Sequence, residues 1–127
     1  MKFQSIALAG LVAILGLASI GESAAQAKMR TVAELHKSRS TLAGQTIRAQ
    51  GQVMKANNGI RGYNFVHVQD GTGTAAASNN NLIVRSKQTA NVGDRVTISG
   101  VVVVNRDFGS GYFYPLLIEE ATITPKK

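Results

Sequence analysis

Four residues whose side chains could bind a ligand alternate along one short stretch: Tyr63, Phe65, His67 and Gln69. Side chains in a β-strand alternate between its two faces, so these four would share one face. The residues between them include two valines, which suit a buried opposite face. Two aromatic rings, an imidazole and an amide favour a surface that binds something flat. Asp70-Gly71 then ends the strand, because glycine takes the positive φ that turns demand.

Some of these residues also have a purely structural interpretation. Tyr63 and Phe65 either lie exposed on a binding face or pack under a loop. His67 has no second ligand nearby in the sequence, which favours a hydrogen-bonded or solvated histidine over a metal ligand. His36 is interpreted as a surface residue of a short helix, not as a ligand.

The sequence contains no recognisable catalytic arrangement. It has no cysteine, no Gly-x-Ser-x-Gly elbow, no phosphate-binding loop and no zinc-ligand spacing. The acidic residues are scattered, and the adjacent Glu119 and Glu120 would face opposite sides of a strand, so they cannot act as a pair. We therefore expect a binding protein and not an enzyme, with no metal and no cofactor.

The first 27 residues have the pattern of a secretory signal peptide. Lys2 precedes an uncharged apolar run, residues 6–20, and Ala25-Gln26-Ala27 is a small-x-small cleavage site. The run is shorter than the roughly 20 residues that a membrane span needs. An uncleaved anchor is the alternative. We expect cleavage after Ala27, a mature domain over residues 28–127 with no stable membrane span, and a periplasmic or secreted location.

The charge of the chain is strongly positive. The sequence has 14 Lys and Arg against 7 Asp and Glu, a net charge of +7. Removing the first 27 residues takes away Lys2 and Glu22, so the net charge of the mature domain is still +7. Such a charge on a small domain favours a polyanionic partner: nucleic acid, anionic lipid or acidic polysaccharide. A basic surface that serves only solubility is the alternative.

The elements that must position these residues are short strands. Alternating and apolar patterns predict five strands, at residues 45–55, 63–69, 82–85, 95–105 and 112–122. Gly51 and Gly100 lie inside two of them and predict bends. Thr31 and Glu34 have the spacing of a capping box at the start of a short helix. Five bent strands and one short N-terminal helix predict an all-β fold that closes into a small barrel.

Four segments support a more specific assignment: residues 42–53 (LAGQTIRAQGQV), 62–73 (GYNFVHVQDGTG), 92–100 (VGDRVTISG) and 107–112 (DFGSGY). Together they resemble bacterial exported OB-fold proteins that are labelled as nucleic-acid-binding or DNA-binding. The resemblance extends over residues 31–123 and implies a five-stranded OB-fold Greek-key barrel. In two respects the chain departs from that family. Phe65 stands where tryptophan is common, and residues 87–94 are short for the usual OB-fold helix, which we expect to be absent.

The resemblance also implies where a ligand would lie. On an OB-fold, ligands lie across strands two and three, between the loops that join strands one to two and four to five. These loops correspond to residues 56–62 and 105–111. The candidate stacking residues are Tyr63, Phe65 and Phe108. The candidate phosphate-binding residues are Lys55, Arg61, Arg85 and Arg106, with Arg48 and Lys87 in a secondary role. His67 and Gln69 complete the candidate nucleic-acid-binding face.

We therefore expect the chain to bind nucleic acid, preferably single-stranded, by stacking bases on rings and pairing phosphates with basic side chains. Two alternatives remain open. One is a protein-interaction or accessory module in the cell envelope. The other is a binder of an anionic oligosaccharide or lipid headgroup.

Overall fold

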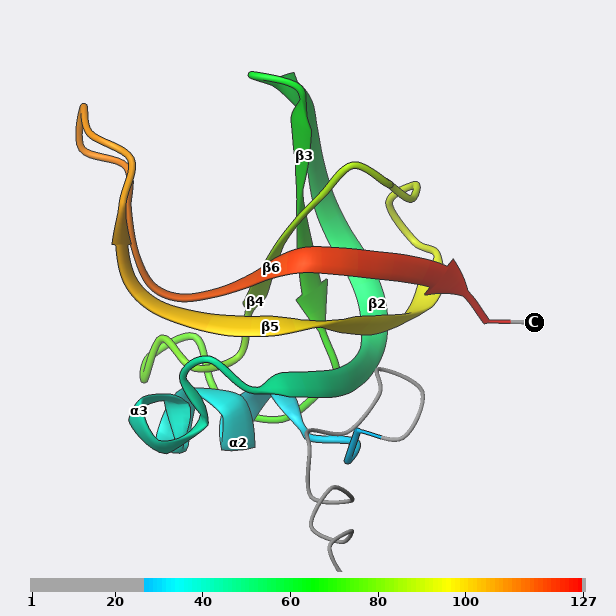
Figure 1. Cartoon of the computed structure of the whole chain (residues 1–127). Coiled ribbons are helices and arrows are strands. Elements are labelled where there is room, and N and C mark those ends of the chain that lie inside the picture. Colours follow the sequence, from blue (N-terminus) through cyan, green and yellow to red (C-terminus); the bar gives the residue numbers. More distant parts are fainter. Residues whose placement is uncertain (1–26, 127) are drawn as a thin grey trace, which may run out of the picture.

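The computed structural model describes residues 27–126, which form two short helices and five strands (Figure 1). The helices are α2 (Val32–Lys37) and α3 (Arg39–Leu42). The strands are β2 (Thr46–Ile60), β3 (Tyr63–Gln69), β4 (Leu82–Ser86), β5 (Arg95–Asp107) and β6 (Phe113–Pro125). The predicted signal peptide lies outside the described residues, apart from Ala27. Neither helix between residues 27 and 126 has the length and apolar character of a membrane span.

The five strands form a closed barrel in the order β2-β3-β4-β6-β5. The β4–β6 pair is parallel, and every other neighbouring pair is antiparallel. The first, second and third strands are thus neighbours, and the fifth lies between the third and the fourth. This order is that of the OB-fold Greek-key barrel, so the predicted fold class is confirmed.

Strand β2 belongs to both halves of the barrel, and Gly51 lies where it changes partner. Its first part, up to Gln52, pairs with β5, and the part from Gln52 to Ile60 pairs with β3. Figure 1 shows β2 as one strongly curved strand. A Cβ atom on Gly51 would lie 2.5 Å from the backbone oxygen of Gln69, so only glycine allows the strands to approach this closely. The change of partner and the close approach to β3 thus occur at the glycine at which a bend was predicted, and the register irregularity with β3 lies just after it, between Val53 and Lys55.

The hairpins are longer than the sequence predicted. Strand β2 continues to Ile60, so the predicted loop at residues 56–62 is reduced to the turn of Arg61 and Gly62. Strand β5 continues to Asp107, and the second loop is reduced to residues 108–112. Cross-strand pairing, such as that of Asn57 with Phe65, overrides the low strand propensity of this asparagine-rich stretch. Helix α3 was not predicted, and residues 87–94 form no helix, as expected.

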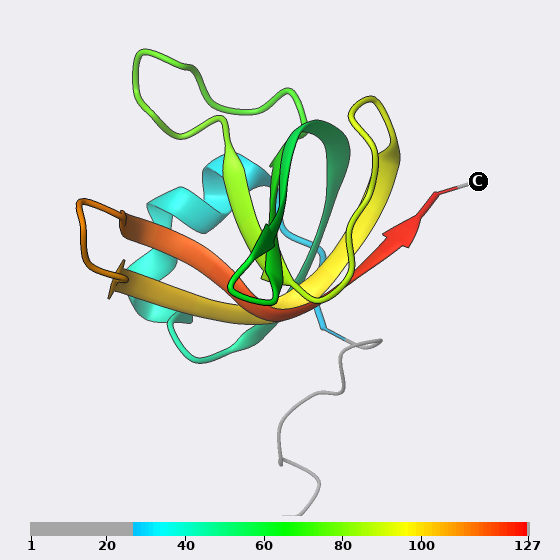
Figure 2. The same cartoon turned by 90° about the horizontal axis from the view of Figure 1, so that it is seen from above.

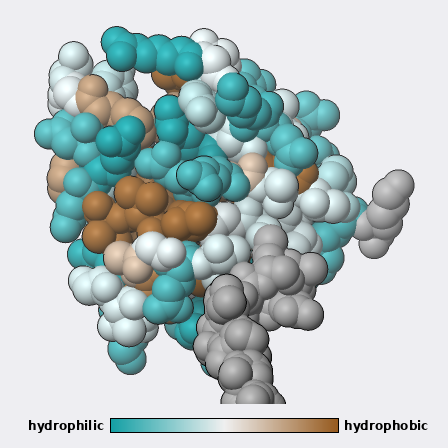
Figure 3. Space-filling view, viewed as in Figure 1, coloured by the Kyte–Doolittle hydropathy of each residue, from teal (hydrophilic) through white to brown (hydrophobic). Residues whose placement is uncertain are grey.

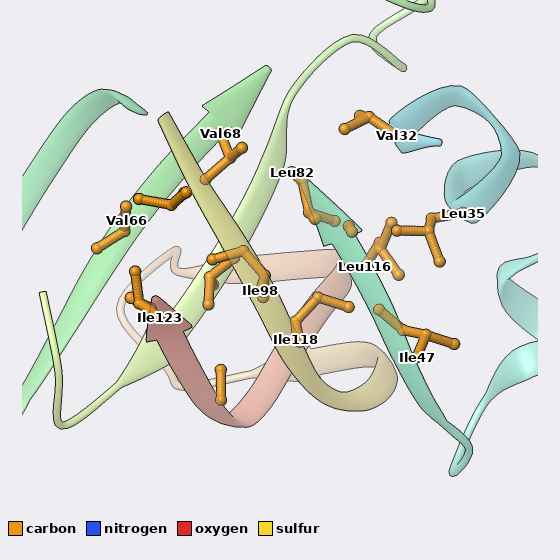
Figure 4. Packing of buried hydrophobic residues seen from close by; sticks show 14 of the residues in the cluster. Val32, Leu35, Ile47, Val66, Val68, Leu82, Ile98, Leu116, Ile118 and Ile123 are labelled. Carbon is orange, nitrogen blue, oxygen red and sulfur yellow. The ribbon is translucent and has the colours of Figure 1, made fainter. Parts of the chain in front are cut away.

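The barrel interior is filled by aliphatic side chains from all five strands, and α2 contributes to the same core (Figure 4). Val32 and Leu35 of α2 are fully buried in it. The helices therefore close one end of the barrel, opposite the ends of the two long hairpins (Figure 1). The predicted capping box begins this helix, because the Thr31 hydroxyl accepts a hydrogen bond from the Glu34 amide at 3.1 Å.

The turn after β3 holds this helix against the barrel. The Val32 amide donates to Asp70 Oδ2 at 2.9 Å, and the Ala33 amide donates to the Thr72 hydroxyl at 3.0 Å. The Thr72 amide in turn donates to Asp70 Oδ1 at 3.0 Å. Partial burial opposes ionisation of Asp70, but the hydrogen bonds from Thr72 and Val32 outweigh it and hold the pKa of the carboxyl below its ordinary value. An ionised Asp70 therefore fixes α2 to the end of β3.

Backbone pairing between β4 and β6 is minimal, and side chains complete the closure. Val84 and Ile118 form the one backbone pair recorded between these strands. The buried Ser86 hydroxyl donates to the carbonyl of Ala121 at 2.6 Å. Two further side chains bridge from β4 and the residues after it to β6: Arg85 to Glu119, and Gln88 to the amide of Ile123. We refer to this set of contacts as the β4–β6 seam.

Replacing Asp70 with asparagine should destabilise the fold by about 0.5–2 kcal/mol at neutral pH, because the amide can replace only one of the two acceptor oxygens that hold the amides of Val32 and Thr72. The pKa of Asp70 is lower in the folded than in the unfolded chain, so its stabilisation is present above the unfolded value, near 4, and is lost as the pH falls through the folded value. Between pH 7 and pH 3, the free energy of unfolding measured with urea should fall less in Asp70→Asn than in the wild type. Glu120→Gln, which alters an exposed carboxylate, is the control. Equal stabilities of Asp70→Asn and this control would contradict the assigned role.

Candidate functional site

The two long hairpins enclose a groove of about 710 Å³. Both project from the same side of the barrel, and their tips are separate when viewed from that side (Figures 1 and 2). Figure 3 shows a hollow between the tips. The β2–β3 hairpin lines the groove with Ala56, Asn57, Asn58, Ile60, Arg61 and Phe65. The other lining residues are Arg85 of β4 and, from the β5–β6 hairpin, Phe108, Gly109, Ser110, Tyr112 and Tyr114. We call this the hairpin groove.

The strand register brings several of the predicted site residues onto one face. Asn57, Phe65 and Arg85 are direct partners across β2, β3 and β4. Lys55 and His67 are partners two residues farther along, on the same face. Phe65 and Arg85 lie in the hairpin groove, whereas Lys55 and His67 lie outside its lining. The alternation pattern therefore predicted the shared face correctly, and the groove covers only part of it.

Phe65 packs within a cluster of rings and is not an open stacking surface. Its side chain is only 7% exposed. The Phe108 ring meets it edge-on at 5.9 Å between centroids, and Tyr114 stacks on it at 5.8 Å. Phe108 and Tyr114 also meet edge-on at 5.7 Å. Of the two interpretations of Phe65, packing under a loop is the one observed, because the β5–β6 hairpin folds over it.

The exposed apolar residues of the groove were missed by the sequence analysis. Tyr112 is 62% exposed, and Ile60 is 44% exposed at the end of the other hairpin. Both line the groove. One signal could have identified the tyrosine: residues 112–114 are three consecutive aromatics, which cannot all point into the same packed interior. These two side chains, and not Phe65, offer free surface to a flat ligand.

A single carboxylate pairs with two of the three predicted phosphate-binding arginines of this region, Arg85 in the groove lining and Arg106 beside it. Arg85 Nη1 lies 2.8 Å from Glu119 Oε1, and Arg106 Nε lies 3.2 Å from Glu119 Oε2. Arg85 also covers the Tyr63 ring, with its guanidinium carbon 3.7 Å from the centroid. Arg106 lies 4.4 Å from the Phe108 centroid. Sequence reasoning missed Glu119, because nothing local indicates that it faces two arginines of other strands.

Arg61 is the groove residue whose charge is open to solvent. It occupies the two-residue turn with Gly62, where both residues have positive φ, as a type I′ hairpin turn requires. Its side chain is exposed, and no ion pair to it is recorded between residues 27 and 126. Lys87 lies beside the groove region, with Nζ 5.0 Å from the Tyr63 centroid. Arg61 and Lys87 are thus placed to meet a negatively charged ligand.

Besides Lys55 and His67, five predicted residues lie outside the groove lining: Tyr63, Lys87 and Arg106 lie beside it, and Arg48 and Gln69 lie away from it. Arg48 is in the first part of β2, where it partners Ser99 of β5. Gln69 partners Gln52 at the far end of β3. Neither lines the groove.

Both histidines bond to Asn81 in the β3–β4 connection. Asn81 Nδ2 donates to His67 Nδ1 at 3.0 Å, and His36 Nε2 donates to the Asn81 carbonyl at 2.7 Å. Burial, and then the charge of Lys55, lower the pKa of His67, which favours the neutral ring that can accept this bond. The prediction of a hydrogen-bonded His67 is confirmed, whereas His36 is partly buried and not a free surface residue. In the described part of the chain, no three His, Cys, Asp or Glu residues are grouped as metal ligands.

Comparisons with known proteins give a structural likeness only. No family model and no curated protein matches the sequence. Among solved structures, the chain is similar to a crystal structure described as an aspartyl-tRNA synthetase from Leishmania major Friedlin, with a TM-score of 0.54 and 13% identity. The match covers 80% of this chain and 22% of that one, so the chain corresponds to less than a quarter of the longer protein. At this identity the likeness supports the OB-fold alone.

Replacing Phe65 with alanine should destabilise the fold by about 3 kcal/mol, because it removes a buried ring from the cluster. Replacing Tyr112 with alanine should change stability by less than about 0.5 kcal/mol, because that ring is exposed. Urea denaturation of the two variants measures the difference directly. Comparable losses in both would mean that the assignment of one ring to packing and the other to ligand contact is wrong.

Proposed function

We propose that this chain binds single-stranded nucleic acid in the hairpin groove. The observation that supports this most is the composition of the groove. Exposed Tyr112 and Ile60 face it from opposite hairpins, and the exposed Arg61 lies at one tip. The groove also lies between the strand one–two and strand four–five hairpins, where OB-folds bind oligonucleotides.

The chemistry of a single strand fits these side chains. A base that stacks on an aromatic ring contributes about 1–3 kcal/mol, and every base has a flat face to offer. Tyr112 supplies such a ring, while Asn57 and Asn58 place amides in the same groove that can hydrogen-bond base edges. The net charge of +7 attracts the phosphates over the whole surface. A duplex, whose bases are already stacked, would gain little from the ring.

The structural neighbour adds little to this proposal. That protein is described as acting with a nucleic acid, tRNA, only through its name, and the likeness concerns the fold. The proposal therefore rests on the groove.

We also propose that the chain acts by binding and not by catalysis, and that it is exported. The export proposal is supported by the sequence pattern of residues 1–27 alone.

Fluorescence anisotropy with a labelled single-stranded oligonucleotide, at several salt concentrations, tests the proposal. Binding should be stronger than to a base-free polyphosphate and should weaken steeply with salt. Tyr112→Ala should lower the affinity about five-fold or more, because it removes a stacking surface. Arg61→Ala should reduce the slope of log affinity against log salt by about 0.7, the effect of one phosphate contact on a single strand.

Two matched variants serve as controls for these changes. Val92→Ala removes an exposed apolar side chain outside the groove, and Lys37→Ala removes an exposed charge on α2. Both should leave the preference for oligonucleotide over polyphosphate unchanged. Equal affinity for oligonucleotide and polyphosphate would show a merely basic surface. Competition by acidic glycans without any base preference would favour the oligosaccharide alternative. Absence of binding at moderate salt would favour a protein partner.

A further inference from the structure

Glu119 is a carboxylate in a region where a polyanion binder would be expected to have free cations. Its two oxygens bind two different guanidinium groups, Arg85 at 2.8 Å and Arg106 at 3.2 Å. The Glu119 side chain is 15% exposed and that of Arg85 is 19% exposed. Arg85 and Glu119 thus lie where most water is excluded, whereas the Arg106 side chain is 44% exposed. Salt screens ion pairs in such surroundings much less than those on an open surface.

Arg85 is also held by contacts that a ligand cannot replace. Its guanidinium carbon lies 3.7 Å from the Tyr63 centroid and 5.3 Å from the Phe108 centroid. Its Nε atom is buried and has no hydrogen-bond partner within residues 27–126. The pair that it forms with Glu119 bridges the β4–β6 seam, where backbone pairing is minimal. Arg85 therefore cannot turn toward a ligand without loosening the barrel closure.

A phosphate that approached these arginines would compete with Glu119. It would have to displace one carboxylate oxygen, and two negative groups would then lie close together at a poorly solvated site. Leaving a partly buried carboxylate without its partner is unfavourable, and so is the repulsion between like charges. Arg85 and Arg106 therefore contribute much less to phosphate binding than their number suggests.

We propose that Glu119, which itself lies outside the groove lining, is a specificity-determining residue: by holding Arg85 it keeps phosphates from this wall of the hairpin groove. This inference rests on the proposed function and gives the orientation of the strand in the groove. The bases face inward, against the Tyr112 side, and the phosphates lie outside, on Arg61 and Lys87. The groove thereby binds ligands through their flat, uncharged bases, and it disfavours polyanions that contain phosphates but no bases.

The test compares Glu119→Gln with Glu120→Gln. Both changes raise the net charge by one, but Glu120 is exposed and makes none of these contacts. Glu119→Gln should release two arginine forks, bind base-free polyphosphate about ten-fold more tightly than the wild type, and reduce the preference for oligonucleotide. Its salt slope should steepen by about 0.7–1.4, as expected for one or two new phosphate contacts. Glu120→Gln should change both quantities much less.

A second variant keeps the inference testable if Glu119→Gln does not fold. Arg106, whose side chain is 44% exposed, shares the single Glu119 carboxylate with Arg85 and has its Nε 3.2 Å from Glu119 Oε2. Arg106→Gln should therefore leave the oligonucleotide salt slope nearly unchanged, whereas Arg61→Ala lowers it. A drop of about 0.7 for Arg106→Gln would identify a direct phosphate contact and overturn the inference.

The remaining outcomes separate this inference from the proposed function. If folded Glu119→Gln binds polyphosphate no better than Glu120→Gln, the phosphate-excluding role of Glu119 is wrong, even when the wild type prefers oligonucleotide. If the wild type shows no such preference, the proposed function fails. A gain of polyphosphate binding in Glu119→Gln would then still support the exclusion of phosphate by Glu119.

Discussion

The ion pair between Arg85 and Glu119 is the interaction on which both the barrel and the groove depend. Strands β4 and β6 have one backbone pair between them, so side chains must complete the closure of the barrel. A partly buried pair of this kind gives little net stability compared with an apolar contact, but removing one partner leaves a charge without compensation. The same ion pair holds Arg85, which lines the groove. Under the proposal above, closure of the fold and selection of the ligand depend on the same contact.

The aromatic side chains divide into a packed set and a free set. Phe65, Phe108 and Tyr114 contact one another and hold the β5–β6 hairpin against β3. This cluster keeps the hairpins apart at a fixed spacing, so the groove exists before any ligand arrives and little ordering is required on binding. Tyr112 extends beyond the cluster from the same hairpin. This arrangement suits stacking, because the exposed Tyr112 ring extends from a hairpin that the packed rings hold in place.

Local patterns in the sequence predicted much of this structure. Alternation along residues 63–69 placed Phe65 and His67 on one face, and Gly51 marked the bend in β2. The capping box marked the start of α2. The failures concern contacts between distant segments. Arg85 and Glu119 are 34 residues apart, and neither has a neighbour that reveals the other. The burial of Phe65 likewise depends on a hairpin more than 40 positions later, which no local period can show.

Backbone amide chemical shifts, followed by NMR during titration with a short single-stranded oligonucleotide, test the central claim most directly. Binding in the hairpin groove predicts that the largest changes occur in two separate stretches, residues 57–62 and 108–114, which meet only across the groove. Residues of α2 and the turn around Val92 should change little. Changes concentrated on α2 or spread evenly over the basic surface, with none at the two hairpin tips, would contradict the assignment of the groove as the binding site.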